Sequence, residues 1–321
     1  MIGYVVRRLL LAVSLVWGVS FGAFVAFGLS FDPTYQFNLC PTPECAVRRA
    51  QIVAAFHLHD PILLRYWSWF SGLFSHGFGK SPAAFYPGGI EGDAIGPELW
   101  HAAGISAQLL CVSLVLVVVA SVFVGVVSAR FAGSPLDWLV RLLAYLAWST
   151  PTFLVGVLLV RWLGPTQWFW IGRVGPGVTG WLRWIALPSI SLALGLVGLY
   201  SRYIRSTMLV SLRQPYADVA RGKGLSERRV VLGHALRNSL VPFVSVLALD
   251  LAAVVGASMA TDYVFGMGGL ADYFLHSIGG ADPFVLTAIL VVIAGVVASL
   301  MFLADLVVGW LDPRARAGVT L

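Results

Sequence analysis

The sequence has 321 residues, of which 59% are hydrophobic and 11% are charged, and its mean hydropathy is +0.85. A water-soluble domain of this composition would expose large apolar patches, so we exclude a soluble protein and expect an integral membrane protein. The net charge of +6 comes from lysines and arginines gathered on one side of the predicted spans, and it gives no reason to infer nucleic-acid binding.

A helix needs roughly 20 apolar residues to cross a hydrocarbon core about 30 Å thick, and a helix satisfies its own backbone polar groups there. We therefore predict an all-α protein with six transmembrane helices, at residues 9–31, 104–129, 142–160, 184–201, 238–261 and 284–311. The chain then divides into the N-terminus and first span (1–31), an external segment (32–103), a five-helix core (104–311) and a tail (312–321).

The external segment after the first span is long enough to have a structure of its own. Residues 46–74 are expected to be helical with a break at Asp60-Pro61, and aromatic residues give this stretch one apolar face. That face could lie on the outer membrane surface or could bind a substrate-delivering protein. Cys40 and Cys45 could form a small disulfide in an oxidising exterior, or could remain unbonded.

Positive charge predicts the orientation of the spans. One side of the predicted spans has 14 of the lysines and arginines and the other side has 7. Both termini and the segment 205–240 are therefore placed in the cytoplasm. Asp262, Asp272 and Asp282 fall in the last external loop, where we expect a negative rim.

The cytoplasmic segment 205–240 has the signals of two short helices joined by Gly-Leu. Pro215 suits a helix start, Gly224 a helix end, and Ser226 the cap of a second helix. Such a loop could carry a function or could simply cover the end of a helix bundle.

Asp250 lies near the centre of the fifth span, where a charge is costly and needs a partner, water or a proton. It could face a translocation cavity, or it could make a hydrogen bond at a subunit interface. Gly79-Lys80-Ser81 resembles the end of a phosphate-binding loop, but Phe74 stands where a further glycine is required. We expect no ATP site, no catalytic residue and no metal site in this chain.

The segment 218–242 resembles the cytoplasmic "EAA" loop of ATP-binding-cassette importer permeases, in the form seen in dipeptide and oligopeptide permease B subunits. It begins Asp218-Val219-Ala220-Arg221-Gly222-Lys223-Gly224-Leu225. Asp218, Val219 and Gly222 depart from the residues common in that loop. Other stretches in the same order also resemble the family, among them Arg7-Arg8-Leu9-Leu10, Ser149-Thr150-Pro151-Thr152-Phe153, Leu187-Pro188-Ser189 and Leu311-Asp312-Pro313-Arg314.

The resemblance implies a subunit of a binding-protein-dependent peptide importer in a bacterial inner membrane. Its implied partners are a sister permease, two cytoplasmic ATPases that bind ATP and Mg, an external binding protein, the peptide substrate and membrane lipid. The residues implied to contact an ATPase are Tyr216, Asp218, Ala220, Arg221, Lys223, Gly224, Leu225, Ser226, His234, Arg237 and Asn238. Asp250 and Pro151 are assigned to the translocation path.

Three alternatives remain open. The same architecture could import nickel, haem or glutathione. A secondary transporter could use an ion gradient through Asp250. An intramembrane enzyme is disfavoured, because no predicted span places Ser with His, paired aspartates or a His-Glu-x-x-His motif in one register.

Overall fold

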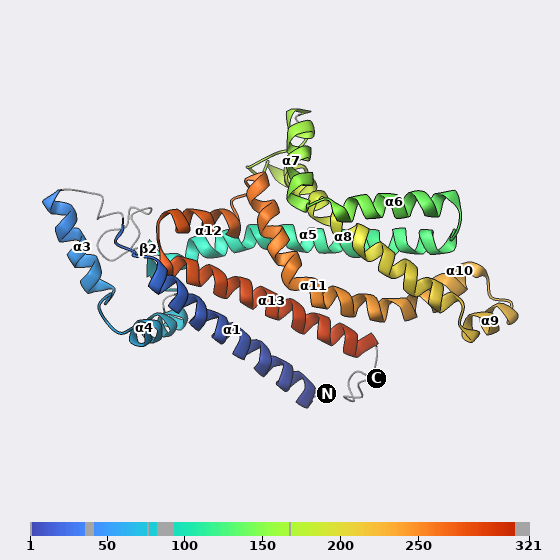
Figure 1. Ribbon diagram of the computed structural model, residues 1–321, viewed down its shortest axis with the longest axis horizontal. Coiled ribbons are helices and arrows are strands. Elements are labelled where there is room, and N and C mark those ends of the chain that lie inside the picture. The colour runs from blue at the N-terminus through green and yellow to red at the C-terminus, as the bar shows by residue number, and fades with distance from the viewer. Residues whose placement is uncertain (1, 36–41, 76, 82–92, 167, 312–321) are drawn as a thin grey trace. The chain divides into compact units, whose positions relative to one another are not determined.

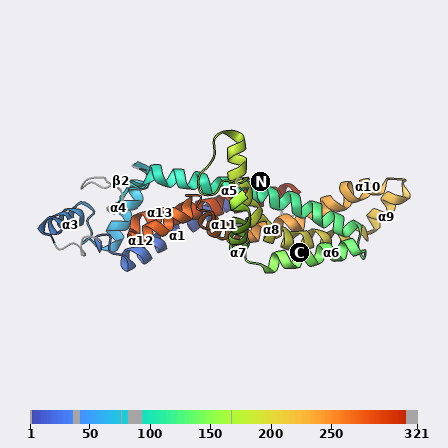
Figure 2. The same ribbon diagram turned by 90° about the horizontal axis from the view of Figure 1, so that it is seen from above.

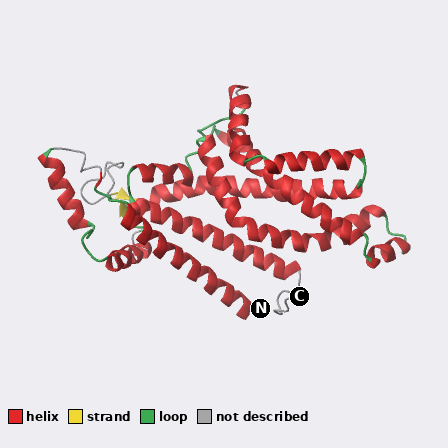
Figure 3. Ribbon diagram, viewed as in Figure 1, coloured by secondary structure: helices red, strands yellow, loops and turns green. Residues whose placement is uncertain are grey.

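The computed structural model of the chain describes residues 2–35, 42–75, 77–81, 93–166 and 168–311. Helices dominate this part of the chain, and a short antiparallel ribbon pairs Lys80 with Ala94 and Ser81 with Asp93 (Figure 3). Among the described residues, five helices are long and apolar enough to cross a membrane, or six if one bent pair counts as a single span. The predicted helical membrane protein is confirmed.

The helices and strands of Figure 1 follow the chain in this order: α1 (Ile2–Ser30), α3 (Pro43–Ala55), α4 (Ile62–Ser75), β1 (Lys80–Ser81), β2 (Asp93–Ala94), α5 (Ile95–Arg130), α6 (Pro135–Ser149), α7 (Thr152–Leu163), η1 (Gly164–Thr166), α8 (Gly177–Leu212), α9 (Pro215–Gly222), α10 (Glu227–Arg229), η2 (Val230–Ala235), α11 (Leu236–Phe265), α12 (Leu270–Gly279) and α13 (Pro283–Leu311). The break expected at Asp60-Pro61 lies between α3 and α4. The predicted tail 312–321 lies outside the described residues.

The third span, expected at 142–160, is not one unbroken helix. This stretch falls on α6 and α7, which are bent by 98° relative to one another. Pro151 has no backbone N–H and disfavours helical geometry at the residue before it, and Thr150 accordingly adopts extended angles (φ −93°, ψ 123°). Hydropathy alone does not register this break, because the residues on both sides of it are apolar.

Two compact units make up the described chain. The first contains Ala107–Met267 and the end of α13. In it α8 packs against α6, α7 and α11, as the two ribbon views show (Figures 1 and 2). Its core contains Val117, Tyr200, Ile204, Met208 and Phe243.

Two glycines allow close helix contacts in the first unit. A Cβ on Gly198 of α8 would lie 2.5 Å from the carbonyl oxygen of Ala144 in α6. A Cβ on Gly125 of α5 would lie 2.6 Å from Ile204 of α8. The backbones of α5 and α6 therefore approach α8 more closely than any larger residue would permit.

The second unit contains Ile2–Ser106 and Gly268–Ser299. Its core is aromatic, with Phe24 of α1, Tyr66 and Trp69 of α4, and Phe284 of α13 all buried. The hydroxyl groups of Ser20 and Tyr66 share a hydrogen bond of 2.9 Å. The expected aromatic face of α4 is thus divided, because Tyr66 and Trp69 are internal whereas Trp67 is exposed.

Two of the three aspartates of the expected negative rim are buried. Asp262 is 0% exposed in α11, and Asp282 is 2% exposed at the start of α13. The carboxylate of Asp282 accepts hydrogen bonds from the backbone N–H groups of Phe284 (2.9 Å) and Val285 (3.2 Å) and from the Ser81 hydroxyl. Asp282 is a helix cap, and the rim prediction is wrong for Asp262 and Asp282.

Candidate functional site

The α9 helix has one buried and one exposed face. It begins at Pro215, where the missing N–H and fixed φ of proline suit the first turn. Ala217 and Ala220 are buried against Val230, and Leu212, Tyr216 and Leu225 pack around them. Asp218 and Val219 point away, and Val219 is 56% exposed. The helix is thus held by small residues on its inner side and leaves an apolar side chain available on its outer side.

The turn after α9 depends on a glycine. Gly224 has φ +80°, a conformation that costs a residue with a Cβ roughly 1 kcal/mol or more. The N–H of Lys223 donates to the carbonyl of Val219 (3.0 Å), and the N–H of Leu225 donates to that of Ala220 (3.3 Å). These bonds satisfy the last carbonyls of the helix and return the chain toward α10.

Arg221 joins the two sides of this turn. Its guanidinium makes two hydrogen bonds of 3.1 Å to the carboxylate of Glu227 and one of 3.0 Å to Asp218. The hydrogen bond to Glu227, helped by Asp218, raises the pKa of Arg221. We call α9, the turn and this ion pair network the clasped loop, residues 215–229.

The second short helix expected after Ser226 is continuous with the long helix that follows it. Ser226 occupies the cap position and its carbonyl accepts from the N–H of Arg229 (2.8 Å), but its side chain makes no capping hydrogen bond. The three-residue α10 leads directly into η2, a stretch of π-helix, and then into α11. A π-helical stretch takes up an extra residue without ending the helix, so the apolar pattern alone does not reveal it.

The residues predicted to contact an ATPase differ in their exposure to solvent. Tyr216 and Leu225 are half-buried, Ala220 is buried, and Arg221 is half-buried within its ion pair network. The others are exposed along the loop and the following helix: Asp218, Lys223, Gly224, Ser226, His234, Arg237 and Asn238. The clasped loop therefore brings together the first eight of the predicted residues, whereas the last three follow on η2 and α11.

Both ends of the clasped loop are fixed to long helices. The hydroxyl groups of Ser211 in α8 and Ser239 in α11 lie 3.3 Å apart, and Ser239 also donates to the carbonyl of Ala235 (2.9 Å). Val231 and Ala235 of η2 belong to the same buried cluster as Met208 of α8. α8, η2 and α11 are therefore joined directly beside the clasped loop.

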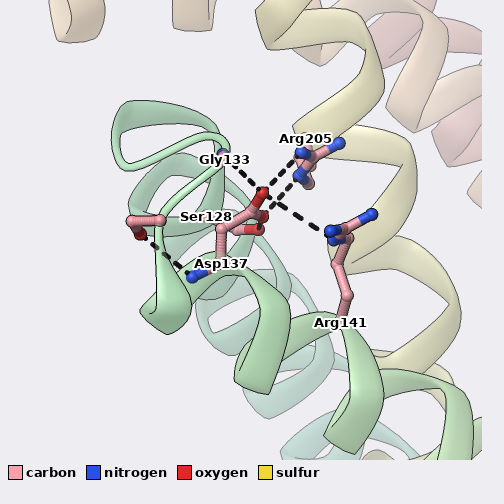
Figure 4. A network of polar contacts seen from close by, with 6 residues as sticks. Ser128, Gly133, Asp137, Arg141 and Arg205 are labelled. Atoms are coloured by element: carbon pink, nitrogen blue, oxygen red, sulfur yellow. Dashed lines mark hydrogen bonds and ion pairs between the residues drawn. The ribbon is translucent and has the colours of Figure 1, made fainter.

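A buried ion pair joins α5, α6 and α8 (Figure 4). Asp137 is 0% exposed and accepts two hydrogen bonds from Arg205, of 2.8 and 2.7 Å. Its carboxylate also accepts from Ser128 (2.5 Å) and from the backbone N–H of Gly133 (3.0 Å), and Arg141 lies 3.7 Å from it. All acceptor positions of this buried charge are thus used.

Asp137 and Arg205 are not predicted from the sequence. The signal that could identify Asp137 is Ser134-Pro135-Leu136-Asp137, a pattern typical of a helix start. In the structure the Ser134 side chain accepts from the N–H of Asp137 (3.2 Å), as that pattern implies. The pairing with Arg205, 68 residues away, has no local signal.

Asp250 has a partner within the chain. The Tyr200 hydroxyl of α8 donates to its carboxylate with a distance of 3.0 Å, so this hydrogen bond joins α8 and α11. Asp250 remains half-buried. Pro151 is exposed at the bend between α6 and α7. The disulfide expected between Cys40 and Cys45 involves Cys40, which lies outside the described residues.

Known proteins resemble this chain over most or nearly all of its length. A family described as binding-protein-dependent transport system inner membrane component matches residues 121–317. The oligopeptide transport system permease protein OppB of Mycobacterium tuberculosis is 34% identical over 98% of both chains. The dipeptide transport system permease protein DppB of Bacillus subtilis is 29% identical over 82% of both chains.

A solved structure has a similar fold. A chain of the methionine ABC transporter MetNI, in an inward-facing conformation, superposes with a TM-score of 0.55. The match covers 67% of this chain and 96% of that chain at 19% sequence identity, which supports a shared fold.

Proposed function

Because this chain belongs to the family of binding-protein-dependent transport system inner membrane components, we propose that it forms half of the translocation path of an ATP-driven peptide importer. The chain is a multi-pass membrane protein and a transport subunit, not an enzyme. Peptide is proposed as the cargo because the OppB and DppB proteins to which it is similar are named as oligopeptide and dipeptide permeases.

The observation that carries this proposal is the clasped loop. It is short and internally cross-linked by Arg221, and the Ser211–Ser239 hydrogen bond joins α8 and α11, the long helices before and after it. A loop with these properties moves as a rigid body. A rigid body that is displaced at one surface can tilt the helices attached to it. A flexible loop of the same length would absorb the displacement.

The proposed binding partner of the exposed face of α9 is one of two cytoplasmic ATPases. Val219 supplies an apolar contact and Asp218 and Lys223 supply charges beside it. The clasped loop is placed in the cytoplasm because lysines and arginines are concentrated on its side of the spans. Both termini follow it there, and the membrane is a bacterial inner membrane.

The remaining partners are a sister permease, which supplies the other half of the path, and an external binding protein that delivers the peptide. Asp250 and Pro151 are proposed to border the path. Asp250 is held by Tyr200, so its carboxylate has a fixed position from which it can meet a peptide amine.

Proteoliposomes containing this chain, its sister permease and both ATPases test the proposal. Val219→Asp places a charge on the docking face without touching the buried face of α9, and it should abolish binding-protein-stimulated ATP hydrolysis and peptide uptake. Val219→Leu keeps the contact apolar and should retain both activities. Full uptake by the Val219→Asp transporter would show that α9 does not receive the ATPase.

A further inference from the structure

A cavity of about 370 Å³ opens in the second unit beside α4. Its walls come from the end of α3, from α4, from β1 and from the first turn of α13. The residues on which the argument depends are Arg65, Trp69, Lys80 and Phe284, together with His57 and Asp60. None of these belongs to the clasped loop, so the cavity plays no part in the proposed coupling to an ATPase.

Two of the residues that line the cavity have a side-chain N–H group without an acceptor. The Nε atom of Arg65 and the Nε1 atom of Trp69 are both buried and have no hydrogen-bond partner. Trp69 as a whole is 6% exposed. A buried donor without an acceptor costs roughly 1–3 kcal/mol, more when it belongs to a charged group, so these atoms favour a ligand that brings oxygen acceptors.

Charge in the cavity favours an anion. Arg65 and Lys80 both line it. Burial lowers the pKa of Arg65 because it disfavours the charged guanidinium, and the negative charge of Asp60 offsets only part of this effect. Asp60 is the carboxylate among the lining residues, and it lies 3.7 Å from Nδ1 of His57 rather than within ion-pair distance of Arg65. A guanidinium with a free edge suits a phosphate, whose oxygens can accept two of its N–H groups.

The position of the cavity relative to the bilayer identifies the source of that phosphate. α4 packs against the last turns of α1, where Ile62 lies 3.3 Å from the position of a Cβ on Gly28 and Trp69 contacts Phe24. Phe284, in the first turn of the last span, lines the same cavity. The cavity therefore lies where both spans reach one membrane surface, the surface opposite the N-terminal end of α1, at the level of lipid headgroups.

The outer side of α4 is suited to lipid. Leu63, Leu64 and Trp67 are 62%, 61% and 64% exposed, and Leu64 also borders the cavity. A helix with exposed leucines and a tryptophan beside basic residues is typical of a segment that lies in the membrane interface. Acyl chains can cover this face while the headgroup enters the cavity.

We propose that this cavity is a phospholipid headgroup site in which Arg65, with Lys80, binds the phosphate of an anionic lipid while α4 contacts its chains. Phosphate oxygens are the kind of acceptor that the N–H groups of Arg65 and Trp69 lack. Occupancy joins α3, α4, β1 and the start of α13 through one ligand.

Native mass spectrometry of the full chain in detergent, with phosphatidylglycerol added, tests the site. Arg65→Gln removes the charge and the fork of donors and should weaken the 1:1 lipid adduct about ten-fold or more. Arg65→Lys keeps the charge and should lose less. Arg173→Gln, which removes an exposed arginine outside the cavity, is the matched control and should bind as the unmodified chain does.

Two further ligands distinguish the source of the phosphate. Diacylglycerol lacks the phosphate and should give no adduct that depends on Arg65. Inorganic phosphate should fail to displace the lipid at millimolar concentration. Equal lipid binding by the Arg65→Gln and Arg173→Gln chains would overturn the site, and displacement by inorganic phosphate would overturn the assignment of a lipid.

Discussion

Asp137 shows how one buried charge can hold three helices of this protein together. Its carboxylate accepts hydrogen bonds from Ser128 of α5, from Arg205 of α8 and from the N–H of Gly133 in the turn before its own helix, α6. A buried ion pair contributes little compared with an apolar pair of the same shape, but removal of one partner leaves the other charge uncompensated. The main effect of this ion pair is therefore to fix the arrangement of α5, α6 and α8.

Replacement of Asp137 by Asn should destabilise the chain by about 3 kcal/mol, because Arg205 then keeps its charge without a carboxylate. Thermal unfolding in detergent measures this. The double variant Asp137→Asn with Arg205→Gln removes both charges and should recover part of the loss. If the double variant were as unstable as the sum of the two single variants, the two residues would not be coupled.

Asp282 is a second residue whose charge decides stability. Burial raises its pKa above the ordinary value of about 3.9, although hydrogen bonds from Ser81, Val285 and Phe284 oppose the shift. Because the folded state favours the protonated carboxyl, its contribution is complete at low pH and is lost as the pH rises through the raised pKa.

The melting temperature of the unmodified chain should therefore fall relative to that of Asp282→Asn as the pH rises above about 4. Asn keeps an oxygen for the N–H groups of Phe284 and Val285 and stays neutral throughout. Asp282→Ala should be about 1 kcal/mol less stable than Asp282→Asn at every pH, because it removes the cap and neither variant titrates. A constant difference between the Asn variant and the unmodified chain would show that Asp282 does not titrate in this way.

At the scale of the element, close helix packing controls the first unit. Gly198→Ala would place a Cβ 2.5 Å from the Ala144 carbonyl oxygen, and because this neighbour is backbone it cannot rotate away. We expect a loss of about 1–3 kcal/mol from the forced separation of α6 and α8. Gly256→Ala on α11 is the matched control, since nothing lies within 4 Å of its Cβ, and it should be neutral or gain up to about 1 kcal/mol. Equal unfolding temperatures for the two variants would contradict the packing account.

The elements also show which parts of the fold were predictable. Long apolar runs identified the spans of α1, α5, α8, α11 and α13, and Pro215 and Gly224 correctly marked the two ends of α9. The bend at Pro151 and the π-helix before α11 are not predicted from the sequence, because hydropathy reports composition and not whether a helix is continuous. Asp137 with Arg205 is not predicted because their pairing is a tertiary contact.

At the scale of the whole molecule, the sequence is enough to identify the resemblance to a family. The structure adds the contacts that hold the clasped loop together. The motif around Lys223 and Gly224 suffices to recognise the resemblance, but it does not show that Arg221 joins Asp218 to Glu227 or that Val219 remains exposed. Those features specify which side chains hold the clasped loop together and which are exposed to a proposed partner.

The central claim is that the exposed face of α9 lies in the cytoplasm and binds an ATPase. A photoreactive benzophenone amino acid in place of Val219, activated in the assembled transporter, tests it most directly. The account predicts a cross-linked product of this chain with an ATPase subunit, and no such product from the same amino acid at Val47, an exposed position of α3. Absence of an ATPase product from position 219, or an equal yield from position 47, would contradict the account.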